Sequence, residues 1–147
     1  MDKIEKIASN LFKKYGTASP FELCEYLGIE VIYQDLPEYV RGFFVKILKK
    51  FVVVKNNNVD EEEERIVCAH ELGHIMLHSE TNSISLNSRT YLCVSKYERE
   101  ADLFAVNLLL QDEILPTDSV SGSLSAEEIS RITHIPLRLI MLKYFPE

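Results

Sequence analysis

The chain has 147 residues, of which 46% are hydrophobic and 27% are charged. This composition is typical of a globular protein, so we expect one domain over residues 1–147 that folds without disulfides or a structural metal. The formal net charge of −7 disfavours direct binding to nucleic acid or to an anionic membrane. The three cysteines form no C-x-x-C pair and the N-terminus lacks a signal peptide's apolar run, so we expect a cytoplasmic protein.

The first half of the chain predicts helices followed by a sheet. Apolar residues at helical spacing over residues 4–15 predict an amphipathic helix that ends at Gly16. Ser19, Pro20 and Glu22 predict the capped start of a short helix. A small antiparallel sheet of about three strands should follow, because three runs are rich in β-branched and aromatic residues. These runs are 29–33, 40–48 and 51–55.

The second half of the chain is predicted to be helical, which makes the fold class α+β. The acidic run 60–64 suits the first turn of a helix that continues to about His78. A connection over 79–94 should lead to a second long helix at 95–111. Residues 113–147 predict two short helices with no basic excess, which we interpret as packing or partner-binding helices and not as a DNA reader.

The sequence His70-Glu71-Leu72-Gly73-His74 is an H-E-x-x-H motif on the first long helix. Residues four apart lie on one helix face, so His70 and His74 can bind the same metal ion. Glu71, about 100° further round the helix, can reach a water bound to that ion and act as the catalytic base. The elongated motif with a third histidine is excluded, because Leu77 and Glu80 replace its glycine and histidine.

A catalytic zinc site needs a third protein ligand and keeps one position open. On the second long helix, Glu98 and Asp102 share an apolar stripe, where a carboxylate is costly unless a positive or hydrogen-bonding group meets it. Glu100 points away from both. We therefore assign Glu98 as the third ligand and Asp102 as the acceptor that orients a ligand imidazole. An alternative role for Glu98 is a capping box with Ser95.

Other residues near the motif have open roles. His78 could bind metal or pack at the end of the helix, whereas His134 is assigned a structural role. Cys68 should point away from the ligand face. Tyr91 and Tyr97 could each donate a hydrogen bond to a developing oxyanion, and packing is the alternative for both.

The chain resembles the ImmA/IrrE family of metallo-endopeptidases, which have a gluzincin-type zinc site. The resemblance extends over roughly residues 20–112, and the zinc-binding Glu of the family pattern falls on Glu98. The stretches that carry it are 27–33, 35–37, 42–43, 64–78 and 98–105. The chain departs from the family at Gln111 and Asp112, where Met-Pro is common, and residues 113–147 match only loosely.

The resemblance implies a zincin-like fold in which the active-site helix packs against the helix that carries Glu98. It also implies one Zn²⁺ per chain and a protein substrate, namely a helix-turn-helix repressor encoded nearby, whose cleavage derepresses phage, mobile-element or stress genes. The alternative is a non-catalytic zinc-bound module that sequesters a repressor or acts in a toxin–antitoxin pair. The set of His70, Glu71, His74, Glu98 and Asp102 is intact, which favours the enzyme, because a module that only binds would not need the catalytic base. A deformylase is disfavoured, because Cys24 lacks the Glu-Gly-Cys-Leu setting.

Overall fold

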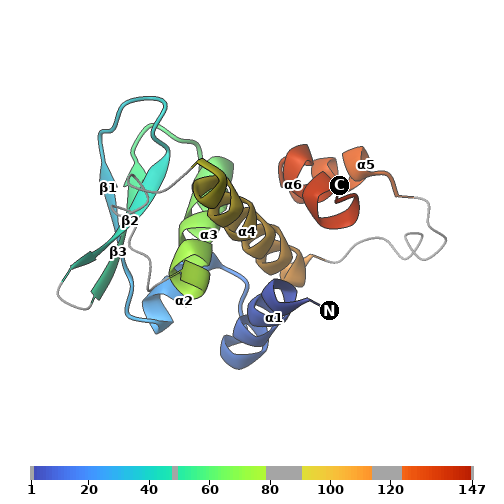
Figure 1. The fold of residues 1–147 in the computed structure, drawn as a ribbon, viewed down its shortest axis with the longest axis horizontal. Helices are drawn as coiled ribbons and strands as arrows, with labels where there is room; N and C mark the ends of the chain where they lie inside the picture. Colours follow the sequence, from blue (N-terminus) through green and yellow to red (C-terminus); the bar gives the residue numbers. More distant parts are fainter. Residues whose placement is uncertain (1, 48–49, 79–90, 114–123, 147) are drawn as a thin grey trace.

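A computed structural model describes residues 2–47, 50–78, 91–113 and 124–146, and these form an α+β fold, as predicted (Figure 1). The elements in chain order are α1 (Lys3–Tyr15), α2 (Pro20–Tyr26), β1 (Glu30–Gln34), β2 (Gly42–Ile47), β3 (Lys50–Asn56), α3 (Glu61–His78), α4 (Tyr91–Leu109), the 3-10 helix η2 (Leu110–Asp112), α5 (Ala126–Thr133) and α6 (Leu137–Tyr144). None of the described helices is long and apolar enough to cross a membrane.

Local chemistry sets the ends of the N-terminal helices. Asp2 caps α1 by accepting a hydrogen bond from the Glu5 backbone N–H, and Gly16 ends the helix in the left-handed conformation at φ 70°. Ser19 caps α2, and Pro20 occupies its first turn. The start of α2 at Ser19 and the end of α1 at Gly16 confirm the sequence-based predictions.

The sheet is mixed, so the expectation of an antiparallel sheet is wrong for β1. The strand order is β1-β3-β2, with β2 antiparallel and β1 parallel to β3. β3 contains the apolar run 51–54 and takes the central position, where both of its edges are paired. Gln34 pairs with Asn56 and Gly42 with Lys55. The connection 35–41 therefore crosses the C-terminal end of β3, from one edge of that strand to the other. Because β1 ends there while β2 begins there, β1 runs parallel to β3 and β2 runs antiparallel to it.

The helices form layers on one side of the sheet (Figure 1). α3 lies against β2 and β3, α4 packs on α3, and α1 and α6 pack on α4. One buried cluster joins the sheet to α3 and α4, and a second joins α4 to the C-terminal helices. The first includes Phe44, Val53, Leu72, Phe104 and Leu108, and the second includes Ala105, Leu109, Ile135, Leu139 and Ile140.

A glycine allows α3 and α4 to approach closely. A Cβ atom on Gly73 would lie 3.0 Å from the Ala101 carbonyl oxygen and 3.0 Å from a ring carbon of Phe104. Any side chain here would press on the backbone of α4, which is tightly packed against α3. The close contact lies inside the H-E-x-x-H motif, so it brings side chains of α4 within reach of the two histidines.

Two cysteines lie in the core, as expected. Cys24 and Cys68 are both fully buried, and their Sγ atoms are 3.9 Å apart as free thiols. Cys68 thus points toward α2 and away from the motif's imidazoles. The side chain of Cys93 lies outside the described residues.

Candidate metal centre

The motif residues of α3 gather their polar atoms in one place. One ligand atom each from His70, Glu71 and His74 lies within 4.8 Å of the other two, so this group could hold a metal ion. His74 and Glu71 are buried, at 3% and 7% exposure. The helical spacing of the motif therefore places its three polar side chains together, as predicted from the sequence.

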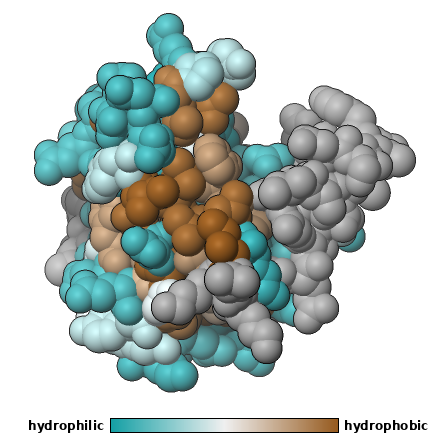
Figure 2. Space-filling view, turned by 90° about the vertical axis from the view of Figure 1, so that its left-hand side faces the viewer, coloured by the Kyte–Doolittle hydropathy of each residue, from teal (hydrophilic) through white to brown (hydrophobic). Residues whose placement is uncertain are grey.

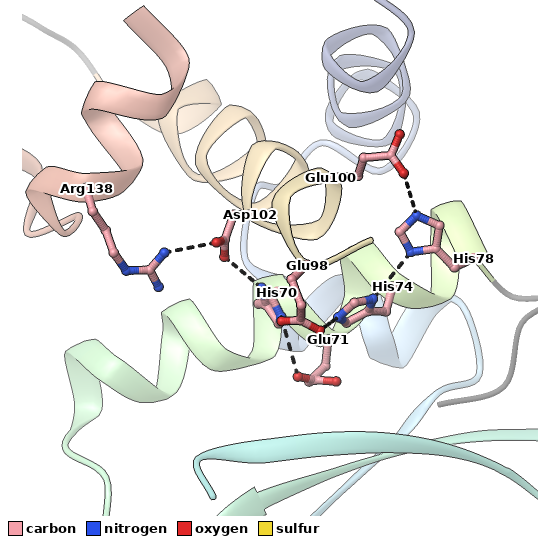
Figure 3. A network of polar contacts seen from close by, with 8 residues as sticks. All are labelled: His70, Glu71, His74, His78, Glu98, Glu100, Asp102 and Arg138. Atoms are coloured by element: carbon pink, nitrogen blue, oxygen red, sulfur yellow. Dashed lines mark hydrogen bonds and ion pairs between the residues drawn. The ribbon is translucent and has the colours of Figure 1, made fainter. Parts of the chain in front are cut away.

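Glu98 of α4 lies between the two imidazoles (Figure 3). Its Oε2 is 3.0 Å from His70 Nε2, and its Oε1 is 2.8 Å from His74 Nε2. Glu98 lies in the interior of the helix, because α4 begins at Tyr91 and not near residue 95. Residues 91–94 contain no proline or glycine that would prevent this extension. The capping-box alternative with Ser95 is therefore excluded.

Asp102 contacts the opposite side of His70. The Nδ1–H of His70 donates to Asp102 Oδ1 at 2.8 Å, and Arg138 Nη1 of α6 donates to Asp102 Oδ2 at 2.9 Å (Figure 3). A carboxylate on the outer ring nitrogen fixes the tautomer and orientation of a ligand imidazole. The structure thus places Asp102 where the expected orienting role requires it, and adds an arginine that the sequence did not indicate.

Two further polar contacts connect His74 to His78 at the end of α3, and His78 to Glu100 of α4. His74 Nδ1 is 3.3 Å from His78 Nδ1, and His78 Nε2 is 3.0 Å from Glu100 Oε1 (Figure 3). Glu100 does lie apart from the pair formed by Glu98 and Asp102, as expected. The contact between Glu100 and His78 was missed, because it depends on how the two helices cross and not on the spacing within either one.

The charges of the cluster shift the pKa values of its members. Burial disfavours the charged form of His70, but hydrogen bonds to Asp102 and Glu98 outweigh it and raise the pKa of His70 to about 10. Burial likewise opposes ionisation of Glu98 and Asp102, yet their hydrogen bonds to His70 keep both pKa values below the usual range. Burial raises the pKa of Glu71 and lowers that of His78.

The donor set suits a divalent metal with affinity for nitrogen and oxygen. Two imidazole nitrogens and one carboxylate meet at a single point, and this combination is used by catalytic zinc sites. The carboxylate of Glu71 stands beside these donors, with its Oε2 4.0 Å from His70 Nε2. The set therefore has the composition of a metal site with a neighbouring acid–base group.

A cavity of about 730 Å³ opens beside these residues. Its wall is formed by Phe43 and Phe44 of β2 on the side of the sheet. It is formed by His134 and Arg138 on the side of the C-terminal helices. Phe43 is 36% exposed, and Figure 2 shows apolar surface on the side of the molecule that carries the sheet. His134 also ends α5 in the left-handed conformation, which fits the structural role expected for it. Its position in the cavity wall was not foreseen.

The structure describes the side chain of only one of the two tyrosines considered as oxyanion donors. The ring of Tyr97 lies 4.4 Å from that of His78, and Tyr97 is not one of the described residues that line the cavity. The side chain of Tyr91 lies outside the described part of the chain. An oxyanion role for either tyrosine remains a prediction.

Comparison with known proteins identifies the family. The family model described as the IrrE N-terminal-like domain of peptidase family M78 matches residues 24–127. The chain is 35% identical to "Uncharacterized immunity region protein 2" of Bacillus phage phi105, over 98% of this chain and 90% of that protein. It is 28% identical to "Metallopeptidase ImmA" of Bacillus subtilis (strain 168), over 90% and 79% of the two chains. The resemblance noted in the sequence is thereby confirmed, and the chain belongs to the ImmA/IrrE family of metallopeptidases.

Proposed function

We propose that this protein is a zinc-dependent endopeptidase in which His70, His74 and Glu98 hold one Zn²⁺ and Glu71 is the catalytic base. The observation that carries the proposal is the position of Glu98, whose two carboxylate oxygens lie 3.0 Å and 2.8 Å from the two imidazoles. A carboxylate from a separate helix meets both histidines of the motif, and the site also has the orienting Asp102.

Hydrolysis of a peptide bond needs an activated water and a group that accepts the proton of that water. A Zn²⁺ held by His70, His74 and Glu98 would supply Lewis acidity, which would lower the pKa of a bound water from about 15.7 toward about 7 and polarise the scissile carbonyl. The Glu71 carboxylate accepts the proton of the attacking water and then delivers it to the leaving amine. Burial raises the pKa of Glu71, which makes it a stronger base than an exposed glutamate. His70 and His74 stay fixed through this step, because packing and hydrogen bonds hold both rings.

β2 is suited to hold an extended peptide beside the motif. It is an edge strand of the described sheet, and Gly42, Phe43 and Phe44 line the cavity. A peptide that adds to this edge would form backbone hydrogen bonds, which depend little on its sequence. Gly42 itself packs closely on α3, because a Cβ there would lie 2.6 Å from Val67 Cγ1. The strand therefore begins directly at the helix that carries the proposed zinc ligands.

The proposed substrate is a helix-turn-helix transcriptional repressor encoded near this protein. The family resemblance supports a repressor, and the name of the phage relative, an immunity region protein, supports a role in controlling phage or mobile-element genes. The net charge of −7 also fits a protein that acts on a DNA-binding protein and does not bind DNA itself.

The test is cleavage of the repressor encoded beside the gene. Wild-type protein loaded with Zn²⁺ should cleave it, whereas Glu71→Gln should bind zinc but not cleave. Glu62→Gln is the matched control, because Glu62 also lines the cavity but its side chain is 58% exposed on the first turn of α3. Equal cleavage by wild type and Glu71→Gln would remove Glu71 as the base. Binding without cleavage by either protein would favour the sequestering module over the enzyme.

A further inference from the structure

His78 is a buried polar residue whose contacts the proposed reaction does not use. It ends α3, is 8% exposed, and has a hydrogen-bonding partner at each ring nitrogen. Nδ1 is 3.3 Å from His74 Nδ1, and Nε2 is 3.0 Å from Glu100 Oε1. Three side chains thus form a continuous line from Glu100 through His78 to His74 (Figure 3).

The chemistry of these contacts fixes the positions of the ring protons. A carboxylate oxygen accepts hydrogen bonds, so the proton of an uncharged His78 lies on Nε2 and is donated to Glu100. His78 Nδ1 is then an acceptor, and His74 must donate from its own Nδ1. An uncharged His74 with its proton on Nδ1 has a lone pair on Nε2, which faces Glu98 Oε1 at 2.8 Å. Two acceptors at this distance repel each other, and a metal ion between them would accept both lone pairs.

We propose that His78 and Glu100 are a positioning pair that holds His74 in the tautomer and orientation needed for metal binding, without either residue touching the metal. The inference rests on the proposed function, because it assumes that His74 binds the metal through Nε2. It assigns His78 a role that is distinct from both of the earlier alternatives, a metal ligand or a packed histidine at the helix end.

The two histidines of the motif are then supported in parallel ways by α4. His70 donates directly to Asp102 at 2.8 Å. His74 lies one turn further along α3, and it reaches a carboxylate of α4 only through His78, at 3.3 Å and then 3.0 Å. Glu98 meets both rings from the other side. A single helix thus supplies the bridging carboxylate and the two carboxylates that orient the imidazoles.

The decisive experiment compares two substitutions of nearly equal shape at His78. In His78→Asn, the side-chain oxygen stands on Cγ, as Nδ1 does in histidine, and can accept from His74. His78→Leu has the same branching and no acceptor. Zinc affinity would be measured by competition with a chromophoric chelator, with circular dichroism as the check on folding. We expect His78→Leu to bind zinc about 10–100-fold more weakly than wild type and His78→Asn to recover most of the loss.

The outcomes separate this inference from the proposed function. Wild-type affinity in His78→Leu, or equally weak binding by the Leu and Asn variants, would overturn the positioning role. Failure of the wild-type protein itself to bind zinc would instead overturn the proposed function. His134→Asn is a control histidine substitution, since asparagine tolerates the left-handed backbone at φ 62°, and its zinc affinity should equal that of wild type.

A second pair of variants tests the same inference if His78→Leu does not fold. The Glu100 side chain is 30% exposed, so substitutions there disturb packing less. Glu100→Gln keeps an oxygen that can accept from His78, whereas Glu100→Ala does not. We expect Glu100→Ala to weaken zinc binding several-fold, less than His78→Leu, because water can replace a partly exposed acceptor. Equal affinity in Glu100→Ala and wild type would contradict the inference.

Discussion

Arg138 and His70 bind different oxygens of the same Asp102 carboxylate, at 2.9 Å and 2.8 Å. Arg138 belongs to α6, beyond the residues 24–127 that the family model matches. The C-terminal helices therefore contribute to the candidate site as well as to packing. This contact is also largely at the surface, since the Arg138 side chain is 65% exposed.

The two residues of this contact should differ in their effect on zinc affinity. Asp102→Ala should weaken zinc binding about 10–100-fold, because His70 loses the acceptor that orients it. Arg138→Ala should weaken it no more than a few-fold, because solvent screens so exposed a cation. Chelator competition measures both, and Arg131→Ala, an exposed arginine of α5, is the control. An equal loss of zinc affinity in Asp102→Ala and Arg138→Ala would contradict this prediction, because it would mean that Arg138 is as important for the metal site as Asp102 itself.

Removing Glu98 should remove the metal. Glu98→Ala leaves two imidazoles and no carboxylate between them, so we expect zinc content to fall from about one per chain to a small fraction of that after dialysis. Atomic absorption on the purified protein measures the content. Glu62→Ala, which removes another acid of the cavity wall, should retain about one zinc. Full zinc content in Glu98→Ala would show that another residue is the third ligand.

Gly73→Ala tests the close contact between α3 and α4. Alanine is favoured over glycine within a helix by about 1 kcal/mol, but its Cβ would lie 3.0 Å from the Ala101 carbonyl oxygen. Overpacking of this kind costs about 1–3 kcal/mol, so we expect a net loss in the free energy of unfolding, measured with urea on the metal-free protein. Zinc affinity should fall as well, because Glu98 would move away from the imidazoles. A stabilised Gly73→Ala protein would show that the helices can separate at little cost.

Zinc affinity should increase with pH. The pKa of His70 is raised to about 10 in the metal-free protein, since its hydrogen bonds to Asp102 and Glu98 outweigh the opposing effect of burial. Zinc must therefore displace a proton from His70 at neutral pH, and the apparent affinity should rise about tenfold per pH unit until the pH approaches that pKa. Titrations between about pH 6.5 and 8.5 measure this slope.

The proton count provides an independent check on the same prediction. Calorimetric titrations in buffers with different heats of ionisation should show that about one proton leaves His70 per zinc bound. Asp102→Asn, which weakens the interaction that stabilises the imidazolium, should lower the pKa of His70 and release a smaller fraction of a proton near pH 8.5. An affinity that does not change with pH would contradict the raised pKa.

The parts of the fold that could be predicted are those determined within one segment of the chain. The spacing of His70, Glu71 and His74 defines a helix face, and the apolar stripe of α4 placed Glu98 and Asp102 on the side that meets it. The cap at Ser19 and the left-handed end of α1 at Gly16 depend on neighbouring residues alone. Most of the helices expected from these patterns are therefore present in the structure.

The features that were missed depend on how separate elements cross. Periodicity cannot tell that β3 lies between β1 and β2, so the parallel pairing of β1 was not foreseen. Glu100 points away from Glu98 on its own helix, and only the path of α3 brings His78 to it. Arg138 comes from a segment that the family resemblance does not reach. Each of these contacts is a tertiary contact between residues distant in the sequence.

The proposed ligands also differ in their access to water. The His74 side chain is 4% exposed, whereas that of Glu98 is 48% exposed. An ion held between them would leave through the Glu98 side, by release of one carboxylate, while the packing around His74 stays intact. Exchange with metal in solution would then be faster than global unfolding, and the emptied site would keep its shape for the next ion.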